Sequence, residues 1–304
     1  MRILITGASG LLGLNLALEA AANHQVFGTV KDHPLKTQAF SVLQTDLLAP
    51  GAVEGVLRDT RPDWVIHCAA LANLDACEAD PALAEQLNTR LPEKLATYVG
   101  RGGARMLHVS TDAVFDGRSG DYSETSQPNP LSVYARTKLE GELAVLEANP
   151  EAIVARVNLF GWSMSGRRSL AEHFFNNLSS GKGMMGFTDV FFCPMVVNDL
   201  ARIFQEMLEK ELGGLYHATG SECTSKYDFG VRLANTFGLD ADLIAPIPVA
   251  ESGLKAARSP HLTMRNDKLR ADLGHDLPSL STGLQRFYTL YQQGYPQKLQ
   301  DLPI

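Results

Sequence analysis

The chain has 304 residues, of which 45% are hydrophobic and 20% charged, and this suits one large α/β unit or two coupled lobes with an ample core. The formal net charge of -7 argues against a nucleic-acid-binding surface. No apolar run is long enough to span a membrane, and Met1 leads directly into a strand pattern, so we expect no signal peptide and a cytoplasmic protein.

The first 23 residues, MRILITGASGLLGLNLALEAAAN, organise the chain. An apolar run at residues 3–5 precedes Gly7, Gly10 and Gly13, and an alanine- and leucine-rich helical pattern follows. A strand that enters a helix through such a turn is typical of dinucleotide binding, because the glycines permit the turn, the approach of the pyrophosphate and close helix packing. The helix start also favours phosphate. A strand–turn–helix with incidental glycines is the alternative, and we interpret the turn as the cofactor site.

Strands and helices alternate through the first half of the chain. After the first strand, further strands are predicted at residues 25–30, 43–47, 64–70, 105–110 and 151–159. After the first helix, further helices are predicted at residues 51–58, 82–99 and 132–148. This repeated alternation predicts an α/β fold, a Rossmann-type doubly wound parallel sheet with helices on both faces.

The alternation changes after Gly161. Helices are predicted at residues 170–178, 198–211, 226–237, 267–273 and 280–291, with a short strand at 215–218 and a loop at 246–260. We therefore predict a dinucleotide-binding domain of residues 1–162, to which residues 195–220 return, and a smaller C-terminal substrate-binding lobe of residues 163–194 and 221–304. The ligand is expected between them, at the carboxyl ends of the strands.

The chain has four cysteines, which are Cys68, Cys77, Cys193 and Cys223. They form no C-x-x-C motif and have no histidine at metal-ligand spacing. We therefore expect reduced, buried thiols rather than disulfides or a metal site. The histidines of two apolar strand runs, His67 and His108, are expected to be core or edge residues rather than catalysts.

Tyr134 and Lys138 form a Y-x-x-x-K motif on the predicted helix 132–148. Residues four apart share a helix face, and an ammonium near a phenol would lower the pKa of the tyrosine, so that Tyr134 could transfer a proton near neutral pH. Ser110 and Thr111 follow a middle strand, where a hydroxyl could polarise a substrate carbonyl. Each feature alone also has a structural explanation, as a helix surface for Y-x-x-x-K and as a cap or turn for Ser110, Thr111 and Asp112.

The order of these features resembles the extended form of the short-chain dehydrogenase/reductase superfamily. Narrower blocks resemble the dTDP-4-dehydrorhamnose reductases, namely CAALANLDACEADPALAEQLN (68–88), STDAVFDG (110–117), YARTKLEGE (134–142), RVNLFGW (156–162) and PMVVNDLA (194–201). Two later blocks resemble that family's C-terminal segments, GLYHATGSECTSKYDF (214–229) and ARSPHLTMRNDKLRADLG (257–274). The resemblance therefore covers nearly the whole chain.

The resemblance implies an NAD(P)H-dependent reductase of a nucleotide-linked 4-keto-6-deoxy sugar. Its catalytic residues would be Thr111, Tyr134 and Lys138: hydride would go to the C4 carbonyl, Tyr134 would donate the proton, and Lys138 would hold the nicotinamide ribose. The residues implied to contact the cofactor are Gly7, Ser9, Gly10, Leu11, Leu12, Gly13, Lys31, Asp46, Leu47, Cys68, Ala69, Ala70, Ser110, Tyr134 and Lys138. Those implied to contact the nucleotide-sugar substrate are Asn73, Ala113, Leu159 and Arg258. No metal is expected, and a homodimer is compatible with the family.

Three positions depart from the family pattern. Ala113 stands where the family usually has an aromatic residue, and Leu159 where it often has tryptophan. In its C-terminal segment the family has an arginine directly before a proline. This chain has Ser259 at that position, and its arginine, Arg258, comes one residue earlier. These departures leave the sugar and its nucleotide open.

Two other functions also stay open. One is another nucleotide-sugar enzyme of the superfamily, an epimerase or a dehydratase. A dehydratase would need a glutamate after Asp112, where this chain has Ala113. The other is a cofactor-binding regulatory subunit without turnover, like that of methionine adenosyltransferase, which is similar to this family. The retained Thr111, Tyr134 and Lys138 argue against it.

The end of the second strand bears on the choice of cofactor. In NAD-selective Rossmann folds an acid ends that strand and binds the ribose 2′-hydroxyl. Here Val30 ends the predicted strand, and Lys31 could pair with a 2′-phosphate. Asp32 would be the ribose ligand if the strand ended one or two residues later. We predict that NADPH is preferred and that NADH can also bind.

Overall fold

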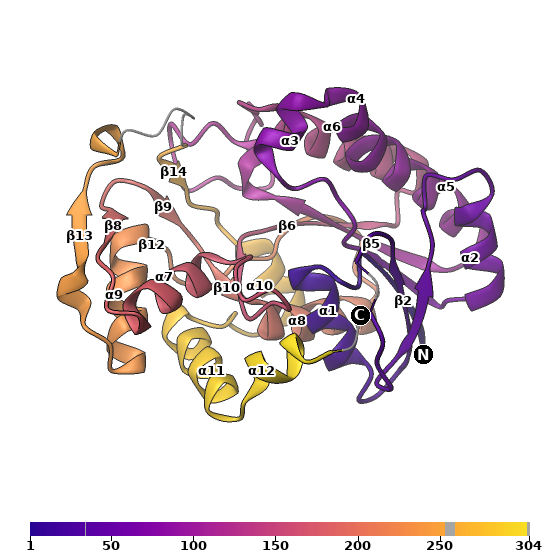
Figure 1. Cartoon of the computed structure of the whole chain (residues 1–304). Helices are drawn as coiled ribbons and strands as arrows, with labels where there is room; N and C mark the ends of the chain where they lie inside the picture. Colours follow the sequence, from indigo (N-terminus) through magenta and orange to yellow (C-terminus); the bar gives the residue numbers. More distant parts are fainter. Residues whose placement is uncertain (34, 253–258, 303–304) are drawn as a thin grey trace.

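A seven-stranded parallel sheet forms the centre of the computed structural model, which describes residues 1–33, 35–252 and 259–302 (Figure 1). In spatial order the strands are β11 (Gly214–His217), β6 (Ile153–Val157), β5 (Arg105–Thr111), β4 (Trp64–His67), β1 (Arg2–Thr6), β2 (Gln25–Val30) and β3 (Ser41–Gln44). The strand order reverses between β1 and β4, where open α/β sheets bind ligands beyond the strand ends. The predicted Rossmann-type fold is confirmed.

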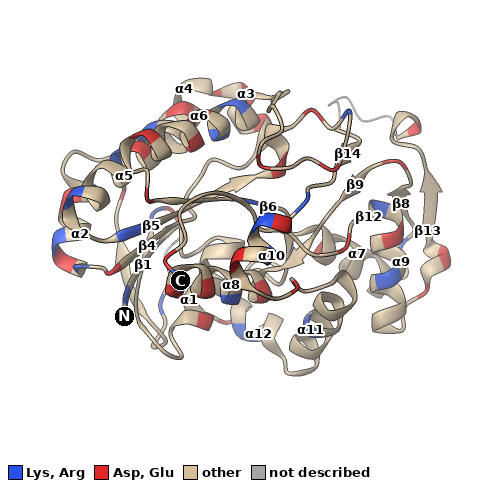
Figure 2. Ribbon diagram, turned by 180° about the vertical axis from the view of Figure 1, so that it is seen from behind, with Lys and Arg blue, Asp and Glu red and all other residues tan. Residues whose placement is uncertain are grey.

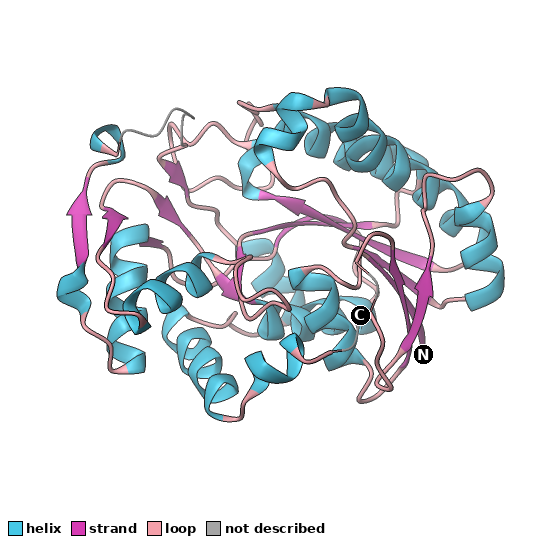
Figure 3. Cartoon of the chain, in the orientation of Figure 1, coloured by secondary structure: helices cyan, strands magenta, loops and turns pink. Residues whose placement is uncertain are grey.

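Helices cover both faces of this sheet (Figure 3). On one face, α1 (Leu11–Ala20) packs against α8 (Val197–Glu209). On the other face lie α2 (Ala52–Thr60), α5 (Leu91–Gly102) and α6 (Val133–Ala148). The alternation of strand side chains divides the core accordingly: Ile3 and Ile5 of β1 join the cluster around α1, and Leu4 joins the cluster around α5. Both faces of the sheet are therefore buried, as parallel sheets require.

The helix predicted at residues 82–99 is interrupted at its centre. After α3 (Leu74–Ala79), the chain forms α4 (Pro81–Glu85), a π-helical segment η1 (Gln86–Arg90) and then α5. Pro92 has no N–H to offer the carbonyl of Asn88, and a Cβ on Gly141 of α6 would lie 2.1 Å from that carbonyl oxygen. The prediction of one regular helix is therefore wrong where this segment packs on α6.

The smaller lobe lies at the left of Figure 1 and is built around short strand pairs. In it β9 (Phe191–Phe192) lies between β12 (Thr224–Ser225) and β14 (His261–Leu262), and β8 (Met184–Phe187) pairs with β13 (Ile244–Ile247). The lobe's longer helices are α7 (Leu170–Ser179), α9 (Lys226–Phe237) and α11 (Leu280–Gln292). The predicted loop at 246–260 is thus partly strand and a 3-10 turn η4 (Val249–Glu251), and residues 253–258 lie outside the described ranges.

The remaining elements are short or lie between the lobe and the sheet. They are β7 (Leu159–Phe160) paired with β10 (Met195–Val196), the 3-10 turns η2 (Asp112–Val114) and η3 (Ala241–Leu243), α10 (Asp267–Leu273) and α12 (Tyr295–Gln300). The sequence pattern did not predict α12. Tyr295 donates a hydrogen bond from its hydroxyl to Asn15 of α1, 2.8 Å away, so this helix is stabilised by a contact distant in sequence.

Two of the four cysteines form a disulfide, so the prediction of four reduced thiols is wrong. Cys193 follows β9 and Cys223 precedes β12, and the antiparallel register of these strands places the two residues opposite each other, with their Cα atoms 4.0 Å apart. The other two, Cys68 and Cys77, are free. Register between strands of two residues cannot be inferred from composition and spacing.

Charged residues of both signs are interspersed on the outer helices, as Figure 2 shows for α2 and α6. Lys94 of α5 pairs with Glu54 of α2 at 3.0 Å, and Arg136 pairs with Glu140 along α6 at 3.9 Å. Within the described ranges, every helix is too short or too polar to cross a membrane.

Candidate active site

The glycine turn between β1 and α1 has the close contacts that only glycine permits. Gly7 has φ of +70°, and a Cβ on it would lie 2.9 Å from the backbone of Ala69. A Cβ on Gly13 would lie 2.2 Å from the carbonyl oxygen of Gly7. Gly10 forms the N-cap of α1, whose first N–H groups have no partner within the helix. This cradle fits the pyrophosphate of a dinucleotide.

The segment after β4 lies against this turn. The hydroxyl of Thr6 accepts a hydrogen bond from the N–H of Ala69 at 3.2 Å. The residues predicted to line the cofactor here range from half-buried, for Cys68 and Ala69, to exposed, for Ala70. Burial raises the pKa of the Cys68 thiol to about 12, so this sulfur is a packing group rather than a nucleophile. Of the other residues predicted at the turn, Ser9 and Leu11 are half-buried and Leu12 is buried.

Three polar side chains of α6 lie on the face that packs against β5. The hydroxyl of Ser132 caps the helix by accepting the N–H of Ala135 at 3.2 Å. From this start, Tyr134, Lys138 and Glu142 follow one another at intervals of four residues. The helix therefore places a phenol, an ammonium and a carboxylate in one row beneath the carboxyl end of the sheet.

Lys138 is only 3% exposed and is bound to β5. Its Nζ donates a hydrogen bond to the carbonyl oxygen of Val109 at 2.7 Å and lies 3.2 Å from Nε2 of His108. Burial lowers the pKa of Lys138 to about 8, and the nearby Glu142 carboxylate opposes this decrease. Lys138 therefore changes charge close to physiological pH.

Thr111 and Tyr134 meet at the carboxyl end of β5. The Thr111 hydroxyl accepts the N–H of Ala113 at 3.2 Å and donates to a carboxylate oxygen of Asp112 at 3.1 Å. Burial raises the pKa of Tyr134 to about 12, although a hydrogen bond with Thr111 opposes this increase. The prediction that Lys138 lowers the pKa of Tyr134 is therefore wrong for this structure, because the ammonium is bound to β5 and burial dominates.

Ser110 belongs to a buried charged cluster that sequence reasoning missed. Its hydroxyl donates to Glu142, whose carboxylate also accepts hydrogen bonds from the Arg156 guanidinium at 2.7, 3.0 and 3.1 Å. Glu142 and Arg156 are each 2% exposed. The Ser110 hydroxyl thus donates its proton to Glu142 of α6 and is not available to polarise a substrate carbonyl. The only sequence signal was the spacing of Glu142, four residues after Lys138.

The predicted adenosine side of the site is formed by the ends of β2 and β3. β2 ends at Val30, as predicted, but β3 ends at Gln44, so the strand predicted at residues 43–47 begins and ends too late. Lys31 forms an ion pair with Asp46 at 3.1 Å. The pKa of Asp46 is lowered mainly because the carboxylate accepts the N–H of Leu48, at 3.0 Å. The neighbouring Leu47 is buried.

Three of the four residues predicted to contact the substrate lie in the described part of the chain. Asn73 caps α3 by accepting the N–H of Ala76 at 2.8 Å. Ala113 lies in η2, beside Thr111, and Leu159 lies in β7, opposite Met195. Arg258 lies outside the described residues.

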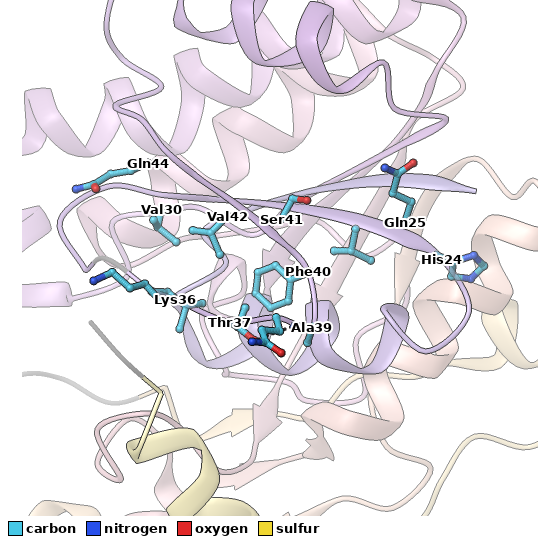
Figure 4. A pocket seen from close by; sticks show the side chains of 13 residues that line it. His24, Gln25, Val30, Lys36, Thr37, Ala39, Phe40, Ser41, Val42 and Gln44 are labelled. Carbon is cyan, nitrogen blue, oxygen red and sulfur yellow. Dashed lines mark hydrogen bonds between the residues drawn. The ribbon is translucent and has the colours of Figure 1, made fainter.

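A cleft of about 800 Å³ lies along β2 and β3, and Thr111, Tyr134 and Lys138 do not line it. Figure 4 shows Phe40 near its middle, with Lys36 and Gln44 toward one end and His24 toward the other. Phe40 packs over Gly28, where a Cβ would lie 2.8 Å from the ring. In the described ranges, no group of three or more histidine, cysteine, aspartate or glutamate side chains could hold a metal ion.

The sheet order, the glycine turn and the Tyr134–Lys138 row together define an extended short-chain dehydrogenase/reductase fold. The family profile described as "RmlD substrate binding domain" matches residues 1–293, and the chain belongs to this family.

Three similar proteins are informative. The chain is 36% identical over 255 residues to "Methionine adenosyltransferase 2 subunit beta" of Xenopus tropicalis, covering 81% of this chain and 75% of that protein. It is 30% identical over 290 residues to "Probable low-salt glycan biosynthesis reductase Agl14" of Haloferax volcanii, covering 93% and 96%. The crystal structure of dTDP-4-dehydrorhamnose reductase from Bacillus anthracis in complex with NADP has a TM-score of 0.80 at 25% identity, covering 95% and 98%.

Proposed function

We propose that this chain is an NAD(P)H-dependent reductase that acts on the C4 carbonyl of a nucleotide-linked 4-keto-6-deoxy sugar. The observation that carries the proposal is the catalytic trio of Thr111, Tyr134 and Lys138 at the carboxyl end of β5. The trio lies near the glycine turn. Lys138 interacts electrostatically with Cys68, and the next residue, Ala69, packs closely on Gly7. The similar Bacillus anthracis and Haloferax volcanii proteins, each named a reductase, support it.

Each residue of this trio has a distinct role in such a reduction. Bound NAD(P)H would supply the hydride. Tyr134 would donate its proton to the carbonyl oxygen as this becomes a hydroxyl, and its pKa of about 12 keeps the phenol protonated until then. Thr111 would orient the phenol and the sugar oxygen by hydrogen bonding. Lys138, fixed to Val109, would offer its charge and its remaining N–H to the cofactor.

We propose NADPH as the preferred cofactor, with NADH also able to bind. Lys31 directly follows the last residue of β2, where a 2′-phosphate would need a cation. Its ion pair with Asp46 is 48% and 42% exposed, and such surface pairs contribute only about 0–1 kcal/mol, so a phosphate can compete for the lysine. The NADP complex of the Bacillus anthracis protein supports this choice. Asp32 remains the residue that would favour NADH.

A panel of nucleotide-linked 4-keto sugars tests the proposal. NADPH oxidation would be followed at the nicotinamide absorbance, with the Tyr134→Phe variant as the control that lacks the proton donor. We expect oxidation with at least one sugar and its loss in the variant. An epimerase would instead change the sugar without net NADPH consumption, which product analysis would show.

A second candidate, a regulatory subunit without turnover, is supported by the 36% identity to a methionine adenosyltransferase subunit. The test is to titrate the chain into a methionine adenosyltransferase catalytic subunit and to measure its rate and the formation of a complex. A complex with altered kinetics, together with confirmed NADPH binding and no oxidation by any sugar, would favour this role over the reductase.

A further inference from the structure

A row of buried polar side chains crosses the sheet beneath α6. Thr6 of β1 pairs in register with His67 of β4, and His67 pairs with His108 of β5. All three are at most 1% exposed. Polar groups at such depth are costly unless they are hydrogen-bonded, so the partner of each side chain matters.

The end of this row contacts the catalytic helix. Nε2 of His108 lies 3.2 Å from the Lys138 ammonium, which donates a second hydrogen bond to the Val109 carbonyl at 2.7 Å. Burial, Lys138 and His67 together hold the pKa of His108 well below its usual value, so its imidazole is neutral. An ammonium can only donate, so we assign Nε2 of this neutral ring as the acceptor and place the ring proton on Nδ1, which has no partner among the described residues.

We propose that His108 is a positioning residue that fixes the Lys138 ammonium for cofactor binding. An ammonium has three N–H donors, and His108 with Val109 takes two of them from the side of β5. The third N–H is thereby directed away from the strand and is left for a ligand. This inference rests on the cofactor-binding role proposed for Lys138, but not on the identity of the sugar.

His67 provides an internal comparison, because it is also a buried histidine but makes no hydrogen bond with Lys138. It lies on the neighbouring strand, its ring stacks on His108 with centroids 5.3 Å apart, and it is equally buried. Its Nδ1 is bound instead to the Thr6 hydroxyl at 2.7 Å. If buried imidazoles merely fill the core here, changes at the two histidines should have similar effects.

The charge of Lys138 makes the pH dependence of cofactor binding a measurable quantity that a purely structural role of His108 would not change. The groups that act on this ammonium are Glu142 on its own helix, Cys68 after β4, and His67 and His108 on the strands. The pKa of Lys138 is about 8, so cofactor binding that needs the charged form should weaken as the pH rises through about 8. An acceptor at position 108 stabilises the charged form. Removing that acceptor should therefore lower the pH at which binding is lost.

Two amide substitutions that differ by one methylene separate these effects. The amide of His108→Gln can reach the place of Nε2, whereas the shorter His108→Asn cannot. NADPH dissociation constants would be measured from pH 6 to 10 for both variants, for His67→Asn and for the wild type, with thermal unfolding as the check on folding. We expect about 10- to 100-fold weaker binding and a lower pH midpoint for His108→Asn, the usual effect of losing a hydrogen bond to a charged group. His108→Gln should lie close to the wild type.

Three outcomes would overturn the proposal: equal affinities and midpoints for His108→Asn and His108→Gln, the same shift for His67→Asn, or a wild type that does not bind NADPH. If His108→Asn does not fold, His108→Met replaces it. A pH midpoint of NADPH binding that is unchanged in His108→Gln and lowered in His108→Met would then support the proposal, and equal midpoints would overturn it. Turnover is not part of this readout. A chain that binds NADPH in the expected pattern but reduces no sugar would therefore support the positioning role and refute the reductase.

Discussion

Replacing Arg156 with methionine should be among the most damaging single changes outside the site itself. The guanidinium donates three hydrogen bonds to Glu142, and the carboxylate's other donor is the Ser110 hydroxyl. Arg156→Met leaves the Glu142 carboxylate, which is 2% exposed, with the neutral Ser110 hydroxyl as its remaining hydrogen-bond donor. Breaking such a buried pair costs about 3–5 kcal/mol. At about 2–4 °C per kcal/mol, the value for domains of roughly 150–250 residues, the melting temperature should fall by about 6–20 °C.

Urea and thermal unfolding would measure this loss, with a matched control on the same helix. Arg136 pairs with Glu140 at 3.9 Å, with both side chains about half exposed, so Arg136→Met should cost less than about 1 kcal/mol. Because the cost comes from an unpaired buried charge, Arg156→Met combined with Glu142→Leu should be more stable than Arg156→Met alone. A single variant within 1 kcal/mol of the control, or a double variant whose losses simply add, would refute the reasoning.

Four further outcomes are expected. Tyr134→Phe should reduce turnover by about 10²- to 10⁴-fold with little change in NADPH affinity, and near-normal turnover would exclude it as the proton donor. Gly13→Ala should abolish NADPH binding in equilibrium titrations, because its Cβ would meet a carbonyl oxygen of the turn at 2.2 Å. Lys31→Ala should lower the NADPH-to-NADH affinity ratio about tenfold or more, and an unchanged ratio would show that the lysine does not bind the 2′-phosphate. Leu159→Trp with Ala113→Tyr should shift substrate preference toward the dTDP-linked rhamnose precursor; a wild type that already prefers this precursor, with a double variant that only loses activity, would contradict the idea.

The sequence was informative wherever a few adjacent residues determine the structure. The glycine turn and the end of β2 at Val30 follow from local steric and pattern rules, and the structure has both. Tyr134 and Lys138 share a helix face because of helix geometry alone. Such features need no knowledge of what packs against them.

The features that could not be predicted depend on partners distant in sequence. Whether Lys138 approaches Tyr134 or binds Val109 depends on how deeply α6 packs on β5, which no local pattern encodes. The Ser110 hydroxyl turns to Glu142, 32 residues away. The Cys193–Cys223 bond likewise requires the register of two very short strands.

The π-helical segment η1 has a consequence for how the family varies in length. A π turn holds one residue more than an α turn, so a relative lacking one residue within 86–90 would have a regular helix there. Asn88 binds the backbone N–H of Leu71 at 2.9 Å and the hydroxyl of Thr137 at 3.1 Å. A relative with the deletion would therefore need a different anchor between its catalytic helix and the segment after β4.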